Sequence, residues 1–262
     1  MVNFELKSRY NYEDLLQIVH ILRSPGGCPW DQEQTHKSIR RDFLEEAYEA
    51  AEAIDLDDTA LLREELGDVL LQVVFHADIE SDAGRFTMED VVDEVAKKMI
   101  FRHPHVFANV QANTTEQVLV NWEQLKQVEK SQKTAADTLD SVARSLPQLW
   151  RAEKIQKKAA KAGFDWVDIS GALDKLEEET AELRRAVETG EGVEDELGDV
   201  LFAAVKVGRF AGLDSEVALS GTCEKFIRRF RAVEDAVRAR GADMKDMPLE
   251  ELTALWEQAK GK

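Results

Sequence analysis

The sequence predicts an all-α fold made of two tandem helical bundles. Nearly every segment of the 262-residue chain places apolar residues at the helical period, and no segment alternates apolar and polar residues over a useful length. A second observation is an internal repeat, in which one acidic pattern occurs twice. The hydrophobic fraction of 44% is enough for a packed core. The length allows one large domain or two domains of about 130 residues each.

The first half contains five predicted helices. Asn11 has the character of an N-cap, and an apolar stripe follows it over residues 15–22, so we expect a helix over residues 11–23. Prolines and glycines in residues 24–29 end this helix because they interrupt its hydrogen-bond ladder. Thr87 and Asp90 have the spacing of a capping box at the start of a later helix. The other helices of this half are predicted over residues 38–54, 60–80, 87–102 and 114–130.

The second half repeats this organisation after a break. Residues 131–145 are predicted to form a linker, because this stretch is polar and has no apolar stripe. The linker separates a predicted N-terminal domain, residues 1–130, from a predicted C-terminal domain, residues 146–262. The helices of the C-terminal domain are predicted over residues 148–161, 169–188, 193–210 and 215–240, with a last helix that begins at about residue 248.

Two acidic stretches carry the clearest repeat. Each reads E-E-x-x-E on one predicted helix and E-L-G-D-V-L on the next. The first copy comprises Glu45, Glu46, Glu49, Glu65 and Asp68. The second copy comprises Glu178, Glu179, Glu182, Glu196 and Asp199. Other features repeat in the same order at offsets of 127 to 134 residues, namely a K-x-x-x-R pair (Lys98 with Arg102, Lys225 with Arg229) and a W-E-Q triplet that starts at Trp122 and at Trp256. The matching order indicates an internal duplication.

The acidic stretches predict one metal site in each half. Residues three or four apart share a helix face, so Glu46 and Glu49 point the same way, and Glu65 and Asp68 do likewise on the next helix. Two antiparallel helices joined by a short turn can bring these pairs together, and converging carboxylates require a cation. Oxygen-only ligands favour a hard ion such as Mg²⁺ or Mn²⁺.

A glutamate-rich helix is also typical of a solvated surface, and two features argue against that interpretation here. Apolar residues such as Leu44 and Val69 lie beside the acids, which places the acids at the edge of a buried face. A glycine precedes each aspartate, Gly67 in the first copy and Gly198 in the second. Glycine costs about 1 kcal/mol relative to alanine in a helix interior, so it is expected to permit close helix approach or ligand access.

The K-x-x-x-R pairs and the net charge indicate which kinds of substrate and partner the chain can bind. Lys225 and Arg229 lie one helical turn apart, and together they offer a point charge and a bidentate fork for phosphate oxygens. Such a pair alone is more often solvent-exposed, but beside metal-bound carboxylates it would clamp a triphosphate. The formal net charge of −18 should repel nucleic acids and anionic membranes, so neither is an expected partner. An anionic substrate would need a metal as intermediary.

The cysteines and the hydropathy favour a cytoplasmic protein. Cys28 and Cys223 are far apart in sequence and form no C-x-x-C motif, which is typical of reduced thiols. No apolar run approaches the roughly 18 residues of a membrane span, and the first ten residues lack the apolar core of a signal peptide.

These motifs resemble the MazG family of the all-α NTP-pyrophosphatase superfamily. The family pattern, E-E-x-x-E followed by E-x-x-D, is similar to both acidic stretches, and further MazG-like stretches lie at residues 27–31, 102–107, 154–158 and 163–166. The resemblance covers nearly the whole chain. The acidic motif alone is shared with dimeric dUTPase-like proteins and with phosphoribosyl-ATP pyrophosphohydrolases.

The resemblance implies two tandem MazG-like bundles that hydrolyse nucleoside triphosphates with Mg²⁺. Halves or chains of such proteins pair, so a homodimer is expected. A metal-activated water would cut between the α- and β-phosphates, which gives a nucleoside monophosphate and pyrophosphate. The second half is the expected main catalytic one, while Asp42 or Arg41 near the place equivalent to Lys175 would weaken phosphate binding in the first half.

The resemblance also implies roles for individual residues. Metal ligands are expected at Glu179, Glu182, Glu196 and Asp199, with Glu46, Glu49, Glu65 and Asp68 as their counterparts in the first half. The expected catalytic residues are Glu178, which would orient or deprotonate the water, and Glu179. Substrate contacts are expected from Lys175, Lys225, Arg229 and Trp256, with Lys98 and Arg102 as first-half counterparts.

Two other functions are compatible with a glutamate-rich helical bundle. A di-iron carboxylate bundle needs E-x-x-H on two helices, and only Glu33 with His36 has this spacing, so that class is rejected. A non-catalytic nucleotide-binding or partner-binding regulatory protein remains the alternative, because the two-domain layout is compatible with it.

Overall fold

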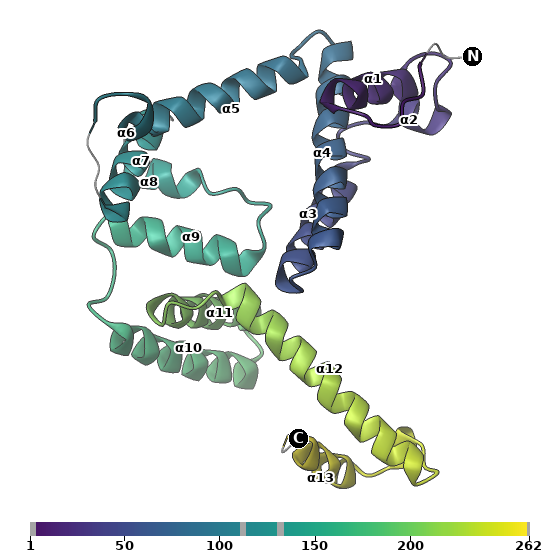
Figure 1. Cartoon of the computed structure of the whole chain (residues 1–262). Helices are drawn as coiled ribbons and strands as arrows, with labels where there is room; N and C mark the ends of the chain where they lie inside the picture. Colours follow the sequence, from purple (N-terminus) through teal and green to yellow (C-terminus); the bar gives the residue numbers. More distant parts are fainter. Residues whose placement is uncertain (1–3, 111–113, 130–133, 261–262) are drawn as a thin grey trace. The chain divides into compact units, whose positions relative to one another are not determined.

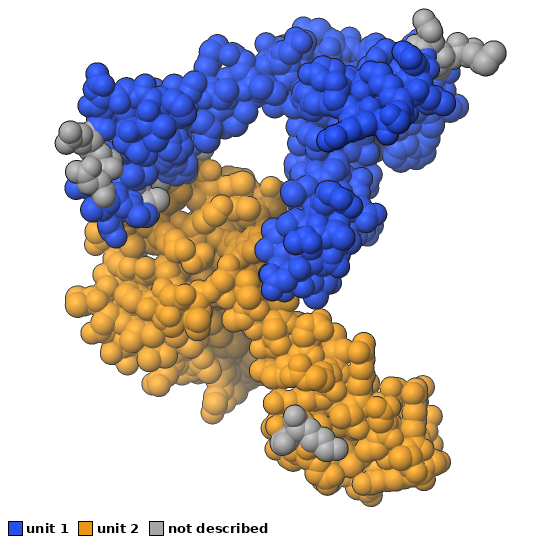
Figure 2. Space-filling view, in the orientation of Figure 1, with its two compact units in different colours: residues 1–126 blue, residues 127–262 orange. Residues whose placement is uncertain are grey.

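The structure, a computed structural model, describes residues 4–110, 114–129 and 134–260 (Figure 1). The described residues form helices joined by turns, without a β-strand, so the predicted all-α class is confirmed. The chain divides into two compact units, residues 1–126 and residues 127–262 (Figure 2). We call them unit 1 and unit 2.

Unit 1 is built around a helical hairpin. The hairpin consists of α3 (Arg40–Asp55) and α4 (Thr59–Asp82), and α1 (Tyr12–Arg23) packs against α4. The predicted N-cap Asn11 is present at the start of α1, where it forms a capping box with Asp14, and the predicted capping box of Thr87 and Asp90 starts α5. The remaining helices of unit 1 are α2 (Pro29–Glu33), α5 (Met88–Arg102), α6 (Pro104–Phe107) and most of α7 (Thr115–Glu129).

The core of unit 1 lies between α1, the segment before α3, and α4. Val19, Ile39, Val74 and Phe75 are buried there, and partly buried leucines of α1 and α4 pack around them. Gly27 enters the tight turn after α1, where a Cβ atom would lie 2.2 Å from the carbonyl oxygen of Ile21. This close approach explains why glycine occupies the turn, and it positions the short helix α2 directly after it.

Unit 2 contains a second hairpin of the same kind. It consists of α10 (Ile169–Thr189) and α11 (Val193–Phe210), and α9 (Gln148–Lys161) packs against α11. The longest helix, α12 (Ser215–Ala239), contacts α9 and α11 and carries α13 (Leu249–Lys260) against its second half, after the short 3-10 helix η1 (Met244–Asp246) (Figure 1). Val233, Val237 and Leu255 form the buried cluster between α12 and α13.

The stretch at residues 163–166 has a structural role in unit 2. Asp165 accepts a hydrogen bond from Lys206 at 2.9 Å and from Arg209 at 2.6 Å, both on α11. The Lys206 ammonium group also lies 4.9 Å from the centre of the Trp166 ring. Trp166 in turn packs so closely on Gly171 that a Cβ atom there would lie 2.3 Å from the indole. These contacts join the turn after α9 to α10 and α11.

Three short helices were not predicted from the sequence. They are α2, α6 and α8 (Ala135–Asp140), of four to six residues each, which is too short for an apolar period to be visible. Helix α8 lies in the range predicted as a linker and packs on α9. Residues 131–133 of that range are outside the described residues, so the domain boundaries stay a prediction. Of the helices in the described part of the chain, none combines the length and the apolar character that a membrane crossing requires.

Candidate functional site

Each hairpin brings together three of the five acidic residues of its repeat copy. In unit 1 the turn between α3 and α4 contains Asp57 in a left-handed conformation, with φ of 53°, and Asp58 caps α4 through the amides of Ala60 and Leu61. In unit 2 the corresponding turn uses Gly190 and Gly192, with φ of 77° and 72°. Because both turns are short, the two helices run antiparallel and their acidic faces meet.

The unit 1 cluster consists of Glu46, Glu49 and Glu65. One carboxylate oxygen from each lies within 4.8 Å of the others. Burial raises the pKa of Glu46, and the nearby carboxylate of Asp68 raises it further. Burial also raises the pKa of Glu65, with additional contributions from the charge of Glu49 and from a hydrogen bond between these two side chains. Burial and the neighbouring carboxylates therefore oppose the ionisation of Glu46 and Glu65.

The unit 2 cluster consists of Glu179, Glu182 and Glu196, again with one oxygen of each within 4.8 Å of the others. Burial raises the pKa of Glu196, and the carboxylates of Glu182, Glu179 and Asp199 add to this effect. One oxygen of Glu196, Oε2, is buried and has no hydrogen-bond partner among the described residues. A buried carboxylate oxygen without a donor, surrounded by other carboxylates, is a donor set that fits a hard divalent cation.

The two clusters differ in the basic side chains that contact them. In unit 2, the Nζ atom of Lys175 lies 2.7 Å from Glu179 Oε1 and 2.9 Å from Glu178 Oε1, and these contacts raise the pKa of Lys175. Arg185 lies 3.0 Å from Glu182. Among the described residues of unit 1, by contrast, no lysine or arginine forms an ion pair with the three glutamates of its cluster.

The glycines that precede Asp68 and Asp199 are not required by helix packing. A Cβ atom at Gly67 or Gly198 would meet no atom within 4 Å. Close helix approach, one of the two roles expected for these glycines, is therefore wrong for the contacts within each unit. Ligand access stays a prediction.

The basic pairs lie on other helices than the clusters. Lys98 is half-buried on α5, and Arg102 is buried with its guanidinium group 5.0 Å from the centre of the Trp122 ring. On α12, Lys225 and Arg229 are half-buried, and neither forms an ion pair with the unit 2 cluster within the described chain.

Trp256 lies on α13, where it packs against α12. Its ring centre is 5.0 Å from that of Phe226, and it belongs to the apolar cluster around Val233 and Val237. A single chain thus brings the carboxylates and Lys175 together, but it does not show Trp256 or the α12 pair in contact with them. The sequence contains no signal for this separation, because α10, α11 and α12 have the same helical pattern wherever they pack.

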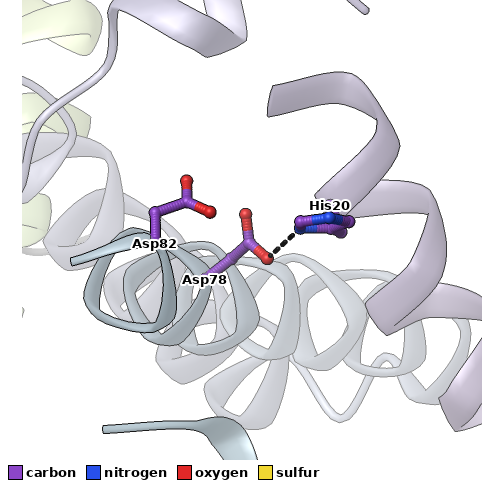
Figure 3. A group of neighbouring side chains, drawn as sticks. All are labelled: His20, Asp78 and Asp82. Atoms are coloured by element: carbon purple, nitrogen blue, oxygen red, sulfur yellow. Dashed lines mark hydrogen bonds and ion pairs between the residues drawn. The ribbon is translucent and has the colours of Figure 1, made fainter. Parts of the chain in front are cut away.

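A further group of titratable residues was not singled out from the sequence. His20 of α1 points toward Asp78 of α4, and Asp82 lies one turn further along the same helix (Figure 3). Three potential ligand atoms of this group lie within 4.8 Å of one another. However, Arg23 already donates to both aspartates, at 2.8 Å to Asp78 and 2.9 Å to Asp82. We interpret the group as an ion-pair network that holds α1 against α4.

The sequence matches one family model twice. The model describes the MazG nucleotide pyrophosphohydrolase domain, and the matches cover residues 34–107 and 169–233. Each match contains one complete hairpin with its acidic cluster, and each continues through the K-x-x-x-R pair of that half. The two matches therefore agree with the internal duplication inferred from the acidic repeat.

Several curated proteins similar to this chain match nearly its whole length. The nucleoside triphosphate pyrophosphohydrolase of Escherichia coli (strain K12) is 46% identical over 251 residues, which make up 94% of this chain and 95% of that protein. A Thermotoga maritima protein described as nucleoside triphosphate pyrophosphohydrolase/pyrophosphatase MazG is 42% identical over 250 residues, or 95% of this chain and 96% of its own. The uncharacterised protein YabN of Bacillus subtilis is 45% identical over 254 residues, which cover 96% of this chain but 52% of YabN.

Proposed function

The chain belongs to the MazG nucleotide pyrophosphohydrolase domain family, and from this we propose that it is a Mg²⁺-dependent nucleoside triphosphate pyrophosphohydrolase. The proposed reaction cuts a nucleoside triphosphate between its α- and β-phosphates and releases a nucleoside monophosphate and pyrophosphate. The observation that carries this proposal is the pair of glutamate clusters, each with a carboxyl group whose pKa is raised by burial and by neighbouring carboxylates. Such clusters are stable when a cation occupies them.

The residues of unit 2 divide into ligands and a base. Glu179, Glu182 and Glu196 would hold Mg²⁺ or Mn²⁺, with Asp199 next to them, and Glu46, Glu49, Glu65 and Asp68 would do so in unit 1. A bound Mg²⁺ would neutralise the triphosphate and lower the pKa of a bound water. Glu178 is 57% exposed, beside Glu179 but outside the cluster, and we propose it as the group that orients and deprotonates the attacking water.

We propose that residues of the hairpin and residues of α12 both contact the substrate phosphates. Lys175 lies at the carboxylates and would bind the substrate phosphates together with Lys225 and Arg229. Trp256 would lie near the nucleotide, where its indole could stack on the base. Lys98 and Arg102 would be the counterparts of the α12 pair in unit 1. We propose unit 2 as the main catalytic unit, because the register that aligns Glu46 with Glu179 places Asp42 at the position of Lys175.

A homodimer is the proposed assembly. The hairpins expose apolar side chains beside the acidic clusters, including Leu66, Leu197 and Leu201, each about half exposed. A hollow of about 600 Å³ also lies along the exposed face of α10, and one of about 350 Å³ lies along α3. Apolar surface of this kind is usually covered in the working assembly, and a second copy could also bring an α12 pair to the carboxylates.

A cytoplasmic location and the absence of nucleic-acid or membrane partners complete the proposal. Both cysteines are free thiols, which fits a reducing compartment. The net charge of −18 opposes binding to nucleic acids or to anionic membranes.

The proposal is tested by incubating the protein with a panel of nucleoside triphosphates and Mg²⁺. Pyrophosphate and orthophosphate are separated and quantified at early times. We expect pyrophosphate and nucleoside monophosphate in equal amounts, and no product when the metal is removed with a chelator. Orthophosphate as the first product would contradict the proposal, and nucleotide binding without turnover would favour the regulatory alternative.

A further inference from the structure

We propose that the two acidic clusters load a divalent cation under different conditions: unit 1 binds it without nucleotide, whereas unit 2 binds it only together with a triphosphate. The reason is that two basic side chains, Lys175 and Arg185, occupy the unit 2 carboxylates and must leave them first. This inference rests on the proposed function, because it concerns the metal that the same carboxylates would hold.

The contacts in unit 2 involve two of its three clustered glutamates. Lys175 Nζ lies 2.7 Å from Glu179 Oε1, and the Glu179 side chain is only 8% exposed. Arg185 donates to Glu182 Oε1 at 3.0 Å. The two bases lie on α10 on either side of the glutamates, at i−4 from Glu179 and i+3 from Glu182, so both reach the cluster from its own helix. Glu196 of α11 is left as the carboxylate without such a partner.

Unit 1 has the opposite charge at both equivalent positions. The register that aligns Glu46 with Glu179 also aligns Asp42 with Lys175 and Glu52 with Arg185. The positions that hold counter-ions in unit 2 therefore hold additional carboxylates in unit 1.

This charge reversal has a direct consequence for cation binding. In unit 1 a divalent cation removes repulsion between carboxylates and displaces no ion pair. In unit 2 the same cation must separate Lys175 and Arg185 from their glutamates, which costs the energy of two partly exposed ion pairs. A triphosphate compensates this cost, because its phosphate oxygens can accept the charge of both side chains as they leave. Lys175 would thereby couple metal loading to substrate arrival.

The test counts protein-bound Mn²⁺ by equilibrium dialysis, without and with the α,β-methylene analogue of ATP, which cannot be cut between these phosphates. The variant Glu46→Gln with Glu65→Gln removes the unit 1 cluster, so unit 2 is observed alone. We expect this variant to bind little Mn²⁺ without nucleotide and to bind it together with the analogue. Adding Lys175→Gln and Arg185→Gln should strengthen nucleotide-free Mn²⁺ binding by roughly tenfold.

The matched control is Lys97→Gln, which removes a lysine that pairs with Asp93 at the same i,i+4 type of spacing and lies outside both clusters. It should leave every Mn²⁺ affinity unchanged. The inference is overturned if unit 2 alone binds Mn²⁺ without nucleotide as tightly as the unaltered chain, if removal of the two bases has no effect, or if unit 1 binds no Mn²⁺. None of these results depends on turnover, so they are distinguishable from a missing pyrophosphate product, which would contradict the proposed function itself.

Discussion

The Nδ1 atom of His36 lies 2.7 Å from the Nδ1 atom of His76, while the two ring centres are 5.0 Å apart. The two nitrogens are therefore within hydrogen-bond distance of each other. The other ring nitrogen of His36 contacts Glu80, which accepts a further hydrogen bond from Arg85 at 2.7 Å. Arg85 lowers the pKa of Glu80 to about 2, so this carboxylate is an acceptor and His36 must donate to it. When His36 is neutral, its Nδ1 accepts and His76 Nδ1 donates.

This chain of contacts predicts a pH dependence of stability. Burial lowers the pKa of His76 below its ordinary value of 6.5, and the neighbouring His36 lowers it further. The unfolded chain therefore takes up this proton at a higher pH than the folded chain does. The contribution of neutral His76 to stability is complete above about pH 6.5 and is lost as the pH falls toward its lowered pKa. Glu80, with a pKa of about 2, contributes only to a loss at much lower pH.

The measurement is urea unfolding of the full chain between pH 8 and pH 5, compared with that of the His76→Gln variant. We expect the difference in unfolding midpoint between the two proteins to shrink as the pH is lowered through 6.5. Glutamine keeps a hydrogen-bonding side chain but cannot titrate, so it isolates the proton. Parallel pH profiles for the two proteins would show that His76 does not contribute.

The two clusters are expected to differ in their importance for catalysis. Glu179→Gln should lower kcat/KM by roughly 100-fold or more, because it removes charge from the proposed catalytic cluster of unit 2. Glu46→Gln is the same substitution at the equivalent place in unit 1, and it should leave most of the activity. Steady-state kinetics of pyrophosphate release for the two variants provide the comparison. An equal loss in both would mean that the two units share the reaction.

Substituting alanine for the glycine before each aspartate should distinguish an effect on protein stability from an effect on substrate access. Gly198→Ala fills open space in a helix interior and should raise the free energy of unfolding by about 1 kcal/mol. If that space admits the substrate, the same variant should raise KM. Gly67→Ala is the matched substitution in unit 1, with the same expected gain in stability and an unchanged KM. A gain in stability from Gly198→Ala with unchanged KM would exclude a role of this space in substrate access.

The contact between α12 and α13 is expected to depend on Leu255. This side chain is 4% exposed between Val233 and Val237, so Leu255→Ala should destabilise the contact by about 2–5 kcal/mol through lost burial and a residual cavity. Leu249→Ala on the same helix is the control, because Leu249 is 74% exposed. The measurement is urea unfolding followed by tryptophan fluorescence, to which Trp256 contributes from its contact with Phe226 next to this cluster. Equal midpoints for the two variants would contradict the packing described here.

The sequence alone determined the fold class, the main helices and the membership of the acidic groups. Helical periodicity is a local property, and caps such as Asn11 with Asp14 act through neighbouring residues, so both are readable without a structure. The convergence of Glu46 with Glu65 could be predicted as well, because a short turn leaves two helices few ways to pack.

The tertiary structure decided which of these residues are in contact and which cations accompany them. Trp256 and the pair on α12 have suitable chemistry for a nucleotide, but contacts between helices place Trp256 against Phe226. The partners Lys175 and Arg185, and the link from His36 through His76 to α4, depend on side-chain distances across and along helices. The helical period of a sequence indicates which face of a helix a residue occupies. Only the packed structure shows what that face contacts, and the charge balance of the two clusters depends on those contacts.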